Sequence, residues 1–328
     1  MSRARDFADL AGSADAGGIT GRNRLLNGSF AVAQRGTSST SGGYVSLDRW
    51  FVNQSGGSTT FSQETNSNPS ETGGLQKYAR LNVSTSSDFT TITQKIEDVT
   101  SVPAGTVTIS FYAKGTAPTG GLYVYGTQDF GTSGSSDVDL TAVQVTASLT
   151  SSWVRYTAQL TIPSVDGKTI NAGSFLVIAI GQYSNTGTTA YDLNIAGVQL
   201  EVGEQATPFE HRSFADEYQK CLRYYWRWTA NTAYDVLSNG GYDVDTTCLT
   251  VHSLPVTMRT EPTISLTGSF QIRADATNFT PSSTEINRAT PWNVELTHTV
   301  ADNNLTGKTG RFRTNNDDDA FVEHTAEL

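Results

Sequence analysis

The chain has 328 residues, of which 37% are hydrophobic and only 16% are charged, and its formal net charge is −10 at pH 7. An acidic surface repels phosphate backbones, so the composition argues against nucleic acid as a partner. No run reaches the roughly 18 apolar residues that a membrane-spanning helix needs, so no membrane insertion is expected. Two cysteines, Cys221 and Cys248, give no disulfide framework. Low apolar and low charged fractions together argue against an ordinary enzyme core and favour many short strands joined by polar turns.

The first residues predict a short N-terminal helix and a linker. Apolar residues recur at helical spacing at Ala4, Phe7, Ala8 and Ala11. This stretch is either a frayed terminus or a small amphipathic anchor that docks on a partner. The Gly-rich residues 12–21 then read as a flexible linker. We treat residues 1–22 as an attachment segment with its linker, and Phe7 and Leu10 as the candidate attachment contacts.

Residues 23–204 have the pattern of an antiparallel jelly-roll β-sandwich. Short runs of strand formers are separated by turn sequences such as TGG, SGS, DGK and NTG, and no helix intervenes. In TVTISFYAK, the residues Val107, Ile109, Phe111 and Ala113 share one face of a strand. The predicted strands are 44–52, 75–83, 90–96, 106–114, 121–126, 138–145, 153–162, 174–180 and 190–202.

Residues 229–328 predict a second, smaller β-sandwich. Proline residues at positions 255, 262, 281 and 291 lie where a strand begins or a turn is needed. The predicted strands are 246–253, 263–273, 292–300, 310–314 and 320–325.

Between the two β regions, SFADEYQKCLRYYWRW (213–228) predicts one amphipathic helix within a connecting segment, 205–228. Its aromatic seam consists of Phe214, Tyr218, Cys221 and Tyr225, at steps of 4, 3 and 4, with Leu222 and Trp228 beside it. Ser213 and Asp216 form a candidate N-cap. A helix of roughly 15 residues is marginal alone in water, so something must cover the seam. Either a sandwich of the same chain covers it, or three copies of the helix share it.

No catalytic constellation is evident in the sequence. The sequence contains no nucleophile elbow, zinc-protease motif or phosphate-binding loop. Its short acidic runs, Asp137 with Asp139 and residues 317–319, fit solvated turns better than a catalytic acid–base pair. We therefore predict no catalytic residue, no metal site and no cofactor. Aromatic side chains are better candidates for a functional site than the acidic residues, because their faces stack on sugar rings. Trp50 and Trp153 are expected in the core, and the candidate glycan contacts are Tyr234, Tyr242 and Trp292.

Several segments resemble the jelly-roll carbohydrate-binding modules that accompany polysaccharide-degrading enzymes. They are RLLNGSF (24–30), DRW (48–50), SFYAKG (110–115), WVRYTAQLTIP (153–163) and IAGVQLEVG (195–203). Where those modules often carry carboxylates that serve a structural calcium, this chain has Ala31 and the apolar residues 195–197. The departure puts a calcium site in doubt, since calcium needs several oxygen ligands.

A second resemblance covers nearly the whole length. The stretch VGEQATPFEHRSFADEYQKCLRYYW (202–226) is similar to a segment of bacteriophage tail-fibre proteins, as are SRARDFADLAG and NRLLNGSFAVAQRG near the start, LPVTMRTEPT (254–263) and the final AEL. This resemblance implies a homotrimer, assembled in the host cytoplasm and located in the virion tail. It implies a neck helix whose shared contacts are Phe214, Tyr218, Cys221, Leu222 and Tyr225.

The implied function is non-enzymatic attachment of the virion to a host-cell surface polysaccharide. The N-terminus would dock on a tail or baseplate protein, and residues 229–328 would be the receptor-binding domain. Two alternatives stay open: a depolymerase of capsule or lipopolysaccharide, and a purely structural baseplate or decoration protein.

Overall fold

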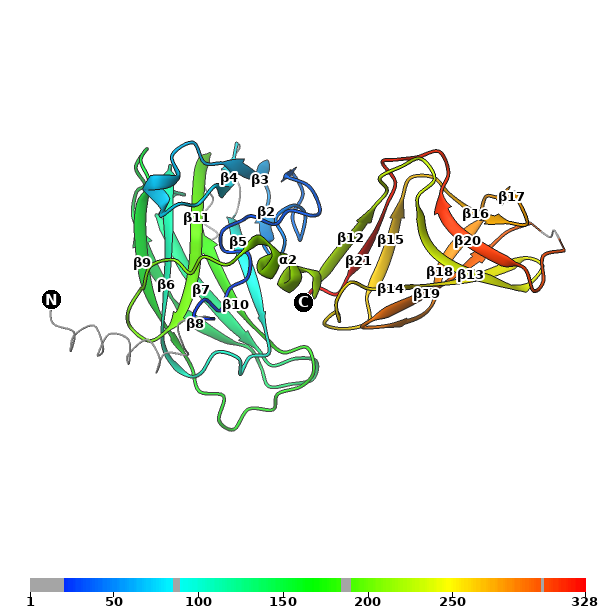
Figure 1. The fold of residues 1–328 in the computed structure, drawn as a ribbon. Coiled ribbons are helices and arrows are strands. Elements are labelled where there is room, and N and C mark those ends of the chain that lie inside the picture. The colour runs from blue at the N-terminus through cyan, green and yellow to red at the C-terminus, as the bar shows by residue number, and fades with distance from the viewer. Residues whose placement is uncertain (1–20, 85–88, 184–189, 302–303) are drawn as a thin grey trace, which may run out of the picture. The chain divides into compact units, whose positions relative to one another are not determined.

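The computed structural model describes residues 21–84, 89–183, 190–301 and 304–328. The chain is nearly all β and divides into two compact units. The first unit extends to Glu217 and includes Leu328, and the second is Tyr218–Glu327 (Figure 1). The division falls inside the predicted connecting segment. Within the described ranges, no helix is long and apolar enough to cross a membrane.

The first unit is a β-sandwich of two antiparallel sheets. Sheet A has the strand order β1 (Ser38–Ser39), β3 (Thr59–Thr65), β4 (Lys77–Val83), β11 (Tyr191–Val202), β6 (Gly105–Gly115) and β9 (Val154–Ile162). Sheet B has the order β2 (Phe51–Ser55), β5 (Phe89–Glu97), β10 (Phe175–Gly181), β7 (Leu122–Asp129) and β8 (Val138–Thr146). A short 3₁₀ turn, η1, spans Pro69–Thr72.

The core of this unit lies between the two sheets and follows from the alternation of inward and outward side chains along the strands. As predicted, Val107, Ile109, Phe111 and Ala113 of β6 share the inward face, and all four are fully buried. Alternate residues of β10 in sheet B, among them Ile178, belong to the same apolar cluster. Burial of each such aliphatic side chain stabilises the fold by roughly 1.5–3 kcal/mol.

The loop before β2 corrects one predicted strand. The strand expected at 44–52 begins only at Phe51, because Arg49 adopts a left-handed φ of 71° that interrupts an extended backbone. Trp50 is buried as expected, and its indole N–H donates to the carbonyl oxygen of Asn27 at 2.9 Å. The Asn27 amide in turn bonds the backbone of Val32 and Asp48, so side chains replace a sheet ladder here.

The second unit contains a three-stranded and a seven-stranded antiparallel sheet. Sheet C has the order β12 (Tyr225–Thr229), β21 (Phe321–Thr325) and β15 (Thr263–Thr267). Sheet D has the order β17 (Thr277–Phe279), β16 (Phe270–Ala274), β20 (Thr309–Thr314), β13 (Val236–Val244), β14 (Thr247–Ser253), β19 (Asn293–Thr299) and β18 (Ser283–Thr290). One apolar cluster joins Ile272, Leu296 and Phe312 of sheet D to Val322 of sheet C.

The predicted helix over 213–228 is wrong in its second half. Helix α2 is Phe214–Leu222, and Tyr225 begins strand β12. The segment YWRWT (225–229) pairs with β21 in register from Tyr225 opposite Thr325 to Thr229 opposite Phe321. Aromatic side chains favour a pleated, half-buried surface, and tertiary pairing outweighs the helical spacing. The predicted N-cap is confirmed, since Ser213 Oγ accepts the N–H of Asp216 at 3.1 Å.

The strand expected at 263–273 is two strands, β15 and β16, that belong to different sheets. The chain turns at Gly268, whose φ is 100°. A Cβ placed there would lie 2.7 Å from the Cβ of Ala320, so the turn needs glycine for both its conformation and its close approach.

Candidate functional site

The outward face of sheet B carries a group of three tyrosines, called here the tyrosine platform: Tyr123, Tyr125 and Tyr183. Strand β7 alternates, so that Leu122 and Val124 enter the core while Tyr123 and Tyr125 point outward. Tyr183 follows the end of β10, which pairs with β7 and places Gly181 opposite Tyr123. The sheet register therefore brings together aromatic residues that lie far apart in the sequence.

The rings of the platform contact one another directly. Tyr183 stacks on Tyr123 with ring centroids 5.5 Å apart and 29° between the planes, and it meets Tyr125 edge-on at 5.2 Å. Tyr183 is 53% exposed, while the other two are half-buried beneath it. The Tyr125 hydroxyl donates to the carbonyl oxygen of Gln182 at 3.2 Å. Burial raises the pKa of Tyr125 above its ordinary value, which keeps that hydroxyl protonated.

Polar side chains flank the platform on both sides. The row that crosses the sheet through Tyr123 consists of Asn53, Thr91, Gly181 and Gln144. Asn53 and Gln144 are exposed, at the two ends of this row. The Gln144 amide nitrogen donates to the carbonyl oxygen of Gly120 at 2.7 Å, which holds this side chain in place. Amide groups both donate to and accept from hydroxyl groups. The face thus offers an exposed aromatic ring with amide groups on either side, a combination that suits a sugar ring.

On the outward face of sheet A, the aromatic cluster around Trp153 is covered by another segment of the chain. Trp153 is 9% exposed, as expected for a core residue, and packs with Leu75 and Ala196. Phe209, from the segment after β11, packs on this cluster, and the ring of Tyr78 meets Trp153 edge-on at 5.2 Å. The segment containing Phe209 therefore covers the part of the outer face of sheet A around Trp153.

Polar contacts hold this segment in place. The Glu201 carboxylate accepts the backbone N–H of Thr207 at 2.9 Å. The Gln199 side-chain oxygen accepts the N–H of Glu210 at 2.7 Å. Arg155 donates to the carbonyl oxygen of Thr207, which also ties strand β9 to the segment.

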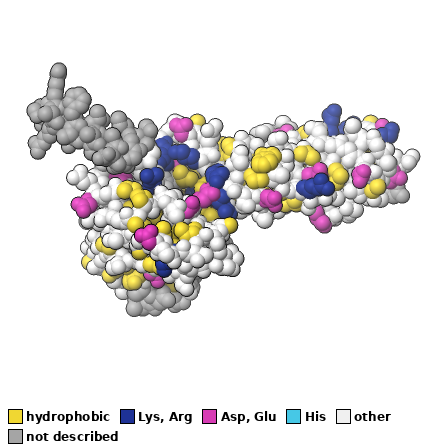
Figure 2. Space-filling model, turned by 90° about the horizontal axis from the view of Figure 1, so that it is seen from below, with side chains coloured by type: hydrophobic (Ala, Val, Ile, Leu, Met, Phe, Trp, Pro, Cys, Tyr) yellow, Lys and Arg dark blue, Asp and Glu magenta, His cyan; other side chains and the backbone are white. Residues whose placement is uncertain are grey.

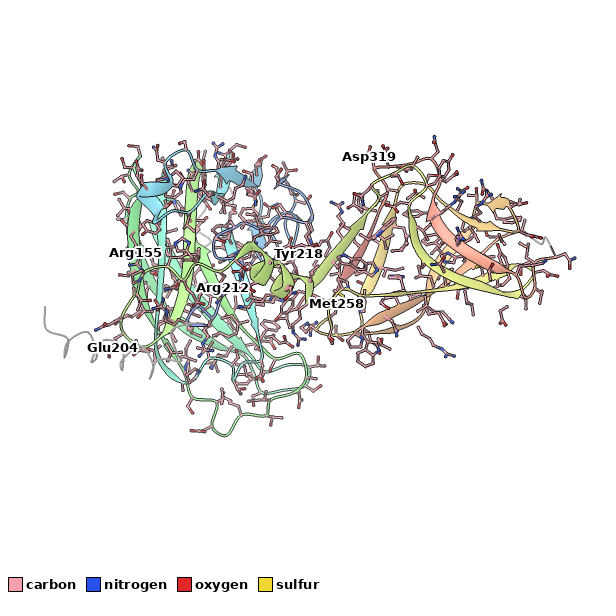
Figure 3. The ribbon with its side chains drawn as sticks, in the orientation of Figure 1. Arg155, Glu204, Arg212, Tyr218, Met258 and Asp319 are labelled. Atoms are coloured by element: carbon pink, nitrogen blue, oxygen red, sulfur yellow. The ribbon has the colours of Figure 1, made fainter. Side chains whose placement is uncertain are left out.

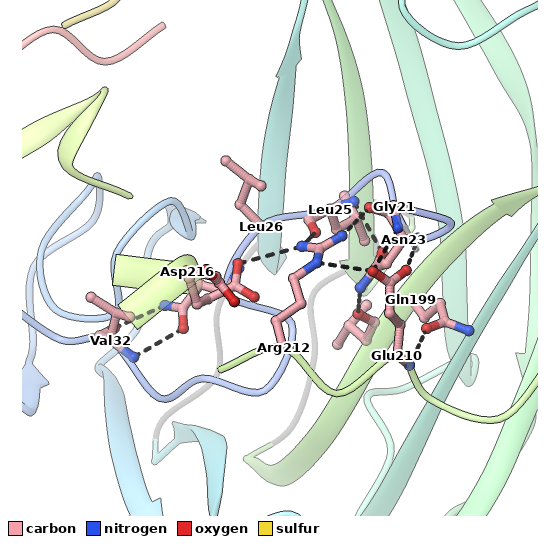
Figure 4. A network of polar contacts seen from close by, with 12 residues as sticks. Gly21, Asn23, Leu25, Leu26, Val32, Gln199, Glu210, Arg212 and Asp216 are labelled. Atoms are coloured by element: carbon pink, nitrogen blue, oxygen red, sulfur yellow. Dashed lines mark hydrogen bonds and ion pairs between the residues drawn. The ribbon is translucent and has the colours of Figure 1, made fainter. Parts of the chain in front are cut away.

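The segment also binds the first described residues of the chain (Figure 4). The Glu210 carboxylate accepts the backbone N–H groups of Gly21 and Asn23 at 2.8 and 2.9 Å. Arg212 donates to the carbonyl oxygens of Asn23 and Leu25. These contacts give the stretch ATPFEHR, which carries much of the tail-fibre resemblance, a structural role in closing the first sandwich.

A pocket of about 410 Å³ lies at the open edge of the same sandwich. It is lined by Thr108, Val143, Thr157, Ala158, Gln159, Glu204 and Ala206. Figure 3 labels Glu204, one of the lining residues. The lining has no aromatic side chain on which a sugar could stack, so the tyrosine platform is the stronger candidate site.

The candidate glycan contacts in the second unit have separate positions. Tyr234 is 47% exposed and Trp292 is 57% exposed, and no ring contact among the described residues joins them. The structure corrects the expectation that Tyr242 is an exposed glycan contact. Its side chain is only 3% exposed and belongs to the apolar core, because it occupies an inward position of β13. It cannot present a ring to a ligand in solvent.

The predicted neck residues differ in exposure. Phe214 is 60% exposed and Tyr218 is half-buried, whereas Cys221, Leu222 and Tyr225 are buried. Buried side chains do not offer a seam to other copies, so only the first turns of α2 keep an exposed aromatic surface. The candidate attachment residues Phe7 and Leu10 lie outside the described residues.

The acidic groups serve local structure. Asp317 accepts the N–H groups of Ser269 and Asp319 at 2.7 and 3.1 Å and so organises a loop, where Figure 3 labels Asp319. Asp139 accepts the Thr127 hydroxyl across two strands at 2.8 Å. Within the described part of the chain, no group of three or more His, Cys, Asp or Glu side chains is placed to hold a metal ion. In the view of Figure 2, most of the surface is uncharged polar side chain and backbone.

The sequence matches no protein-family model. It also matches no curated protein. Solved structures with similarity include a family 61 carbohydrate-binding module in complex with β-1,4-galactotriose, with 16% identity, a TM-score of 0.29, and coverage of 55% of this chain and 97% of that one. A family 4 carbohydrate-binding module has 18% identity and a TM-score of 0.31, with coverage of 53% and 97%. The enzymatically active domain of tailspike protein 4 of bacteriophage CBA120 has 13% identity and a TM-score of 0.33, with coverage of 55% of this chain and 21% of that one.

Proposed function

We propose that this chain is a non-enzymatic glycan-binding protein whose first unit grips a surface polysaccharide through the tyrosine platform. The observation that carries the proposal is the exposed ring of Tyr183, which is held by Tyr123 and Tyr125 and flanked by amide side chains. A sugar ring has a face of C–H groups and a rim of hydroxyl groups. Its C–H face suits an aromatic ring, and its hydroxyls suit the amides at the ends of the row.

The pre-formed geometry of the platform reduces the cost of binding. Tyr123 and Tyr125 support Tyr183 from below and from one side, and the hydroxyl of Tyr125 is tied to the backbone at Gln182. A ring that is already restrained loses less conformational freedom when a ligand binds. No nucleophile, metal ion or buried acid is needed for this task, which accords with a binding protein.

The biological setting that we propose is attachment of a bacteriophage to its host through a trimeric tail fibre. This part of the proposal rests on the resemblance of residues 202–226 and of the two ends of the chain to tail-fibre proteins. A single sugar contact is weak, since desolvation offsets much of its gain. Three linked copies would raise the apparent affinity by roughly 10²–10⁴ where the glycan spacing allows joint engagement.

The test compares two exposed tyrosines, one in each unit. Tyr183→Ala is expected to weaken binding to a neutral host polysaccharide by roughly 2- to 12-fold per site, the range for an aromatic contact of about 0.5–1.5 kcal/mol. Tyr234→Ala removes a ring of similar exposure from the second unit and is the matched control. Loss of binding in Tyr234→Ala alone would place neutral-glycan recognition in residues 229–328 and refute the role of the platform.

Two further measurements address the remaining parts of the proposal. Purified protein incubated with the same polysaccharide should release no new reducing ends, and turnover would establish a depolymerase instead. Light scattering of the full chain should give the mass of three copies. A stable monomer would refute the proposal of a trimeric fibre. The proposal of a glycan site is tested separately, by Tyr183→Ala.

A further inference from the structure

The outward face of sheet D carries three arginines that are close together in a protein whose overall charge is strongly negative. Arg311 and Arg313 alternate with the buried Phe312 on β20, and Arg273 follows the buried Ile272 on β16. Arg273 and Arg311 are direct cross-strand partners. We call these three residues the arginine cluster. Like charges directly opposite each other destabilise a sheet, so a cluster of this kind needs another reason to exist.

Two of the guanidinium groups converge on one neutral oxygen atom. Asn278 Oδ1, on the neighbouring strand β17, accepts from Arg273 Nη1 at 3.1 Å and from Arg313 Nη2 at 3.2 Å. An amide oxygen thus lies where a carboxylate would usually neutralise the charges. Among the described residues, no Asp or Glu forms an ion pair with any of the three arginines. The nearby carboxylate of Asp275 is directed to Lys308, at 3.7 Å.

An aromatic ring supports the cluster from one side. The Arg313 guanidinium carbon lies 4.9 Å from the ring centroid of Tyr234, a cation–π contact. Partial burial lowers the pKa of Arg313, and the charges of Arg273 and Arg311 lower it further. The side chains Arg311, Asn278 and Tyr234 are exposed, so the cluster is open to solvent. The repulsion within it would be relieved by an anion.

We propose that Arg273, Arg311 and Arg313 form a binding site for the oxyanion groups, phosphate or carboxylate, of an acidic surface polysaccharide. Guanidinium groups bind both kinds of oxyanion through paired N–H donors. Three of them on one sheet face suit a ligand with repeated negative charges. The choice of a polysaccharide as the carrier rests on the proposed function, whereas recognition of the oxyanion does not. The site is distinct from the tyrosine platform. The first unit would therefore bind neutral sugar rings, and the second unit would bind the oxyanion groups of an acidic polysaccharide.

The experiment measures binding of the full chain to four probes: polygalacturonate, which bears carboxylates, a phosphomannan, which bears phosphates, neutral dextran, and a short DNA duplex. Wild-type protein is expected to bind one or both acidic polysaccharides, more weakly as salt rises, and not dextran through this site. The stronger acidic probe identifies the oxyanion. Tighter binding to DNA than to either acidic polysaccharide would overturn the proposal, as would no binding to either.

Substitutions separate a built site from general charge. Arg311→Gln and Arg313→Gln are each expected to weaken acidic-polysaccharide binding on the order of tenfold. The control is Arg288→Gln, because Arg288 is exposed on β18 at the far edge of the same sheet and loses the same charge. It should change binding by less than about twofold. Equal losses in all three variants would show a diffuse charge effect and refute the site.

Asn278→Asp provides a test that does not depend on removing an arginine. It places a carboxylate where Arg273 and Arg313 already converge, so the protein should supply its own anion. Binding of acidic polysaccharide should fall at least tenfold while the thermal transition of the second unit stays or rises. Unchanged binding would contradict the proposal. Tyr183→Ala should leave acidic binding intact, so failure of the tyrosine platform and failure of this site are distinguishable.

Discussion

Replacing Arg212 with methionine should destabilise the first unit strongly, because this side chain neutralises two carboxylates that are largely shielded from solvent. Arg212 is 8% exposed, and Glu210 and Glu217 are 10% and 7% exposed. The guanidinium lies 3.3 Å from Glu210 and 3.5 Å from Glu217, and it also donates to the backbone of Leu25 and Asn23. Methionine keeps much of the length of the side chain and removes its charge and its donors.

The expected cost follows from what remains in place. Removing one partner of a buried ion pair typically costs about 3–5 kcal/mol, because the other charge stays buried without compensation. Here the carboxylates keep some donors: Glu210 accepts from Gly21 and Asn23, and Glu217 accepts from Asn27 at 2.5 Å. We therefore expect about 3–4 kcal/mol. For a unit of this size the melting temperature should fall by roughly 6–16 °C.

The matched control is Arg80→Met. Arg80 forms a two-pronged pair with Asp192, with Nη2 2.7 Å from Oδ2, yet the two side chains are 41% and 33% exposed. An exposed pair contributes only about 0–1 kcal/mol, however short its contact. Urea denaturation of both variants, followed by scanning calorimetry, measures the difference. If Arg212→Met costs no more than Arg80→Met, the reasoning from burial is wrong.

Acid should weaken the same contacts in a defined range. Burial raises the pKa of Glu210, but the backbone N–H groups of Asn23 and Gly21 and the charge of Arg212 outweigh it, so the net pKa lies below its ordinary value of 4.5. A lowered pKa means that the stabilisation is present above about pH 4.5 and is lost as the pH falls through the folded-state value. In Arg212→Met this part of the acid sensitivity should shrink.

Two further predictions concern the second unit. A Cβ on Gly240 would lie 1.7 Å from the carbonyl oxygen of Leu249, whereas a Cβ on Gly241 would lie 3.3 Å from its nearest atom. Gly240→Ala should therefore lower the free energy of unfolding by more than about 2 kcal/mol, and Gly241→Ala by much less. Urea denaturation measures both changes. Burial lowers the pKa of His252 to about 4 and of His298 and His324 to about 3. In the unfolded chain these histidines bind protons near pH 6.5, whereas in the folded unit they stay neutral to lower pH. The free energy of unfolding of the second unit should therefore fall by up to about 4 kcal/mol per pH unit on acidification from pH 6 to pH 5. An unfolding free energy that does not change over this range would contradict buried neutral histidines.

The alternation of side chains made most of the first sandwich predictable. The strands β4 to β11 lie within a few residues of the predicted ranges, because most of them alternate between polar and apolar residues and β10 is a short apolar run. Some strands without such a pattern were missed. Strand β13 reads VLSNGGYDV, where Asn and Gly resemble a turn, yet the close approach of Leu249 demands a glycine at position 240 within a continuous strand.

The aromatic run after α2 shows why local spacing was insufficient there. Seam residues at steps of 4, 3 and 4 fit the period of a helix. The segment YYWRW also places aromatic residues at every second position, as a strand does, so a segment this short is compatible with both periods. The pairing partner that decides the matter, β21, comes about a hundred residues later, at Phe321–Thr325. Tertiary pairing therefore selects the strand, and no signal within the segment itself reveals the choice.

Both candidate sites depend on register, which explains why sequence reasoning named no residue of the tyrosine platform or of the arginine cluster. Tyr123 and Tyr125 are recognisable as one outward face of a strand, but Tyr183 joins them only because β10 pairs with β7. The arginine cluster has the same origin, since Arg273 and Arg311 meet across β16 and β20. In a β protein a one-residue shift of register would turn these side chains to the opposite face. The surfaces that we propose for binding are thus produced by long-range strand pairing, whereas the core that supports them is produced by local alternation. Substitutions in the sites should therefore change binding with little effect on folding, whereas core substitutions should lower the stability of the unit that carries the site.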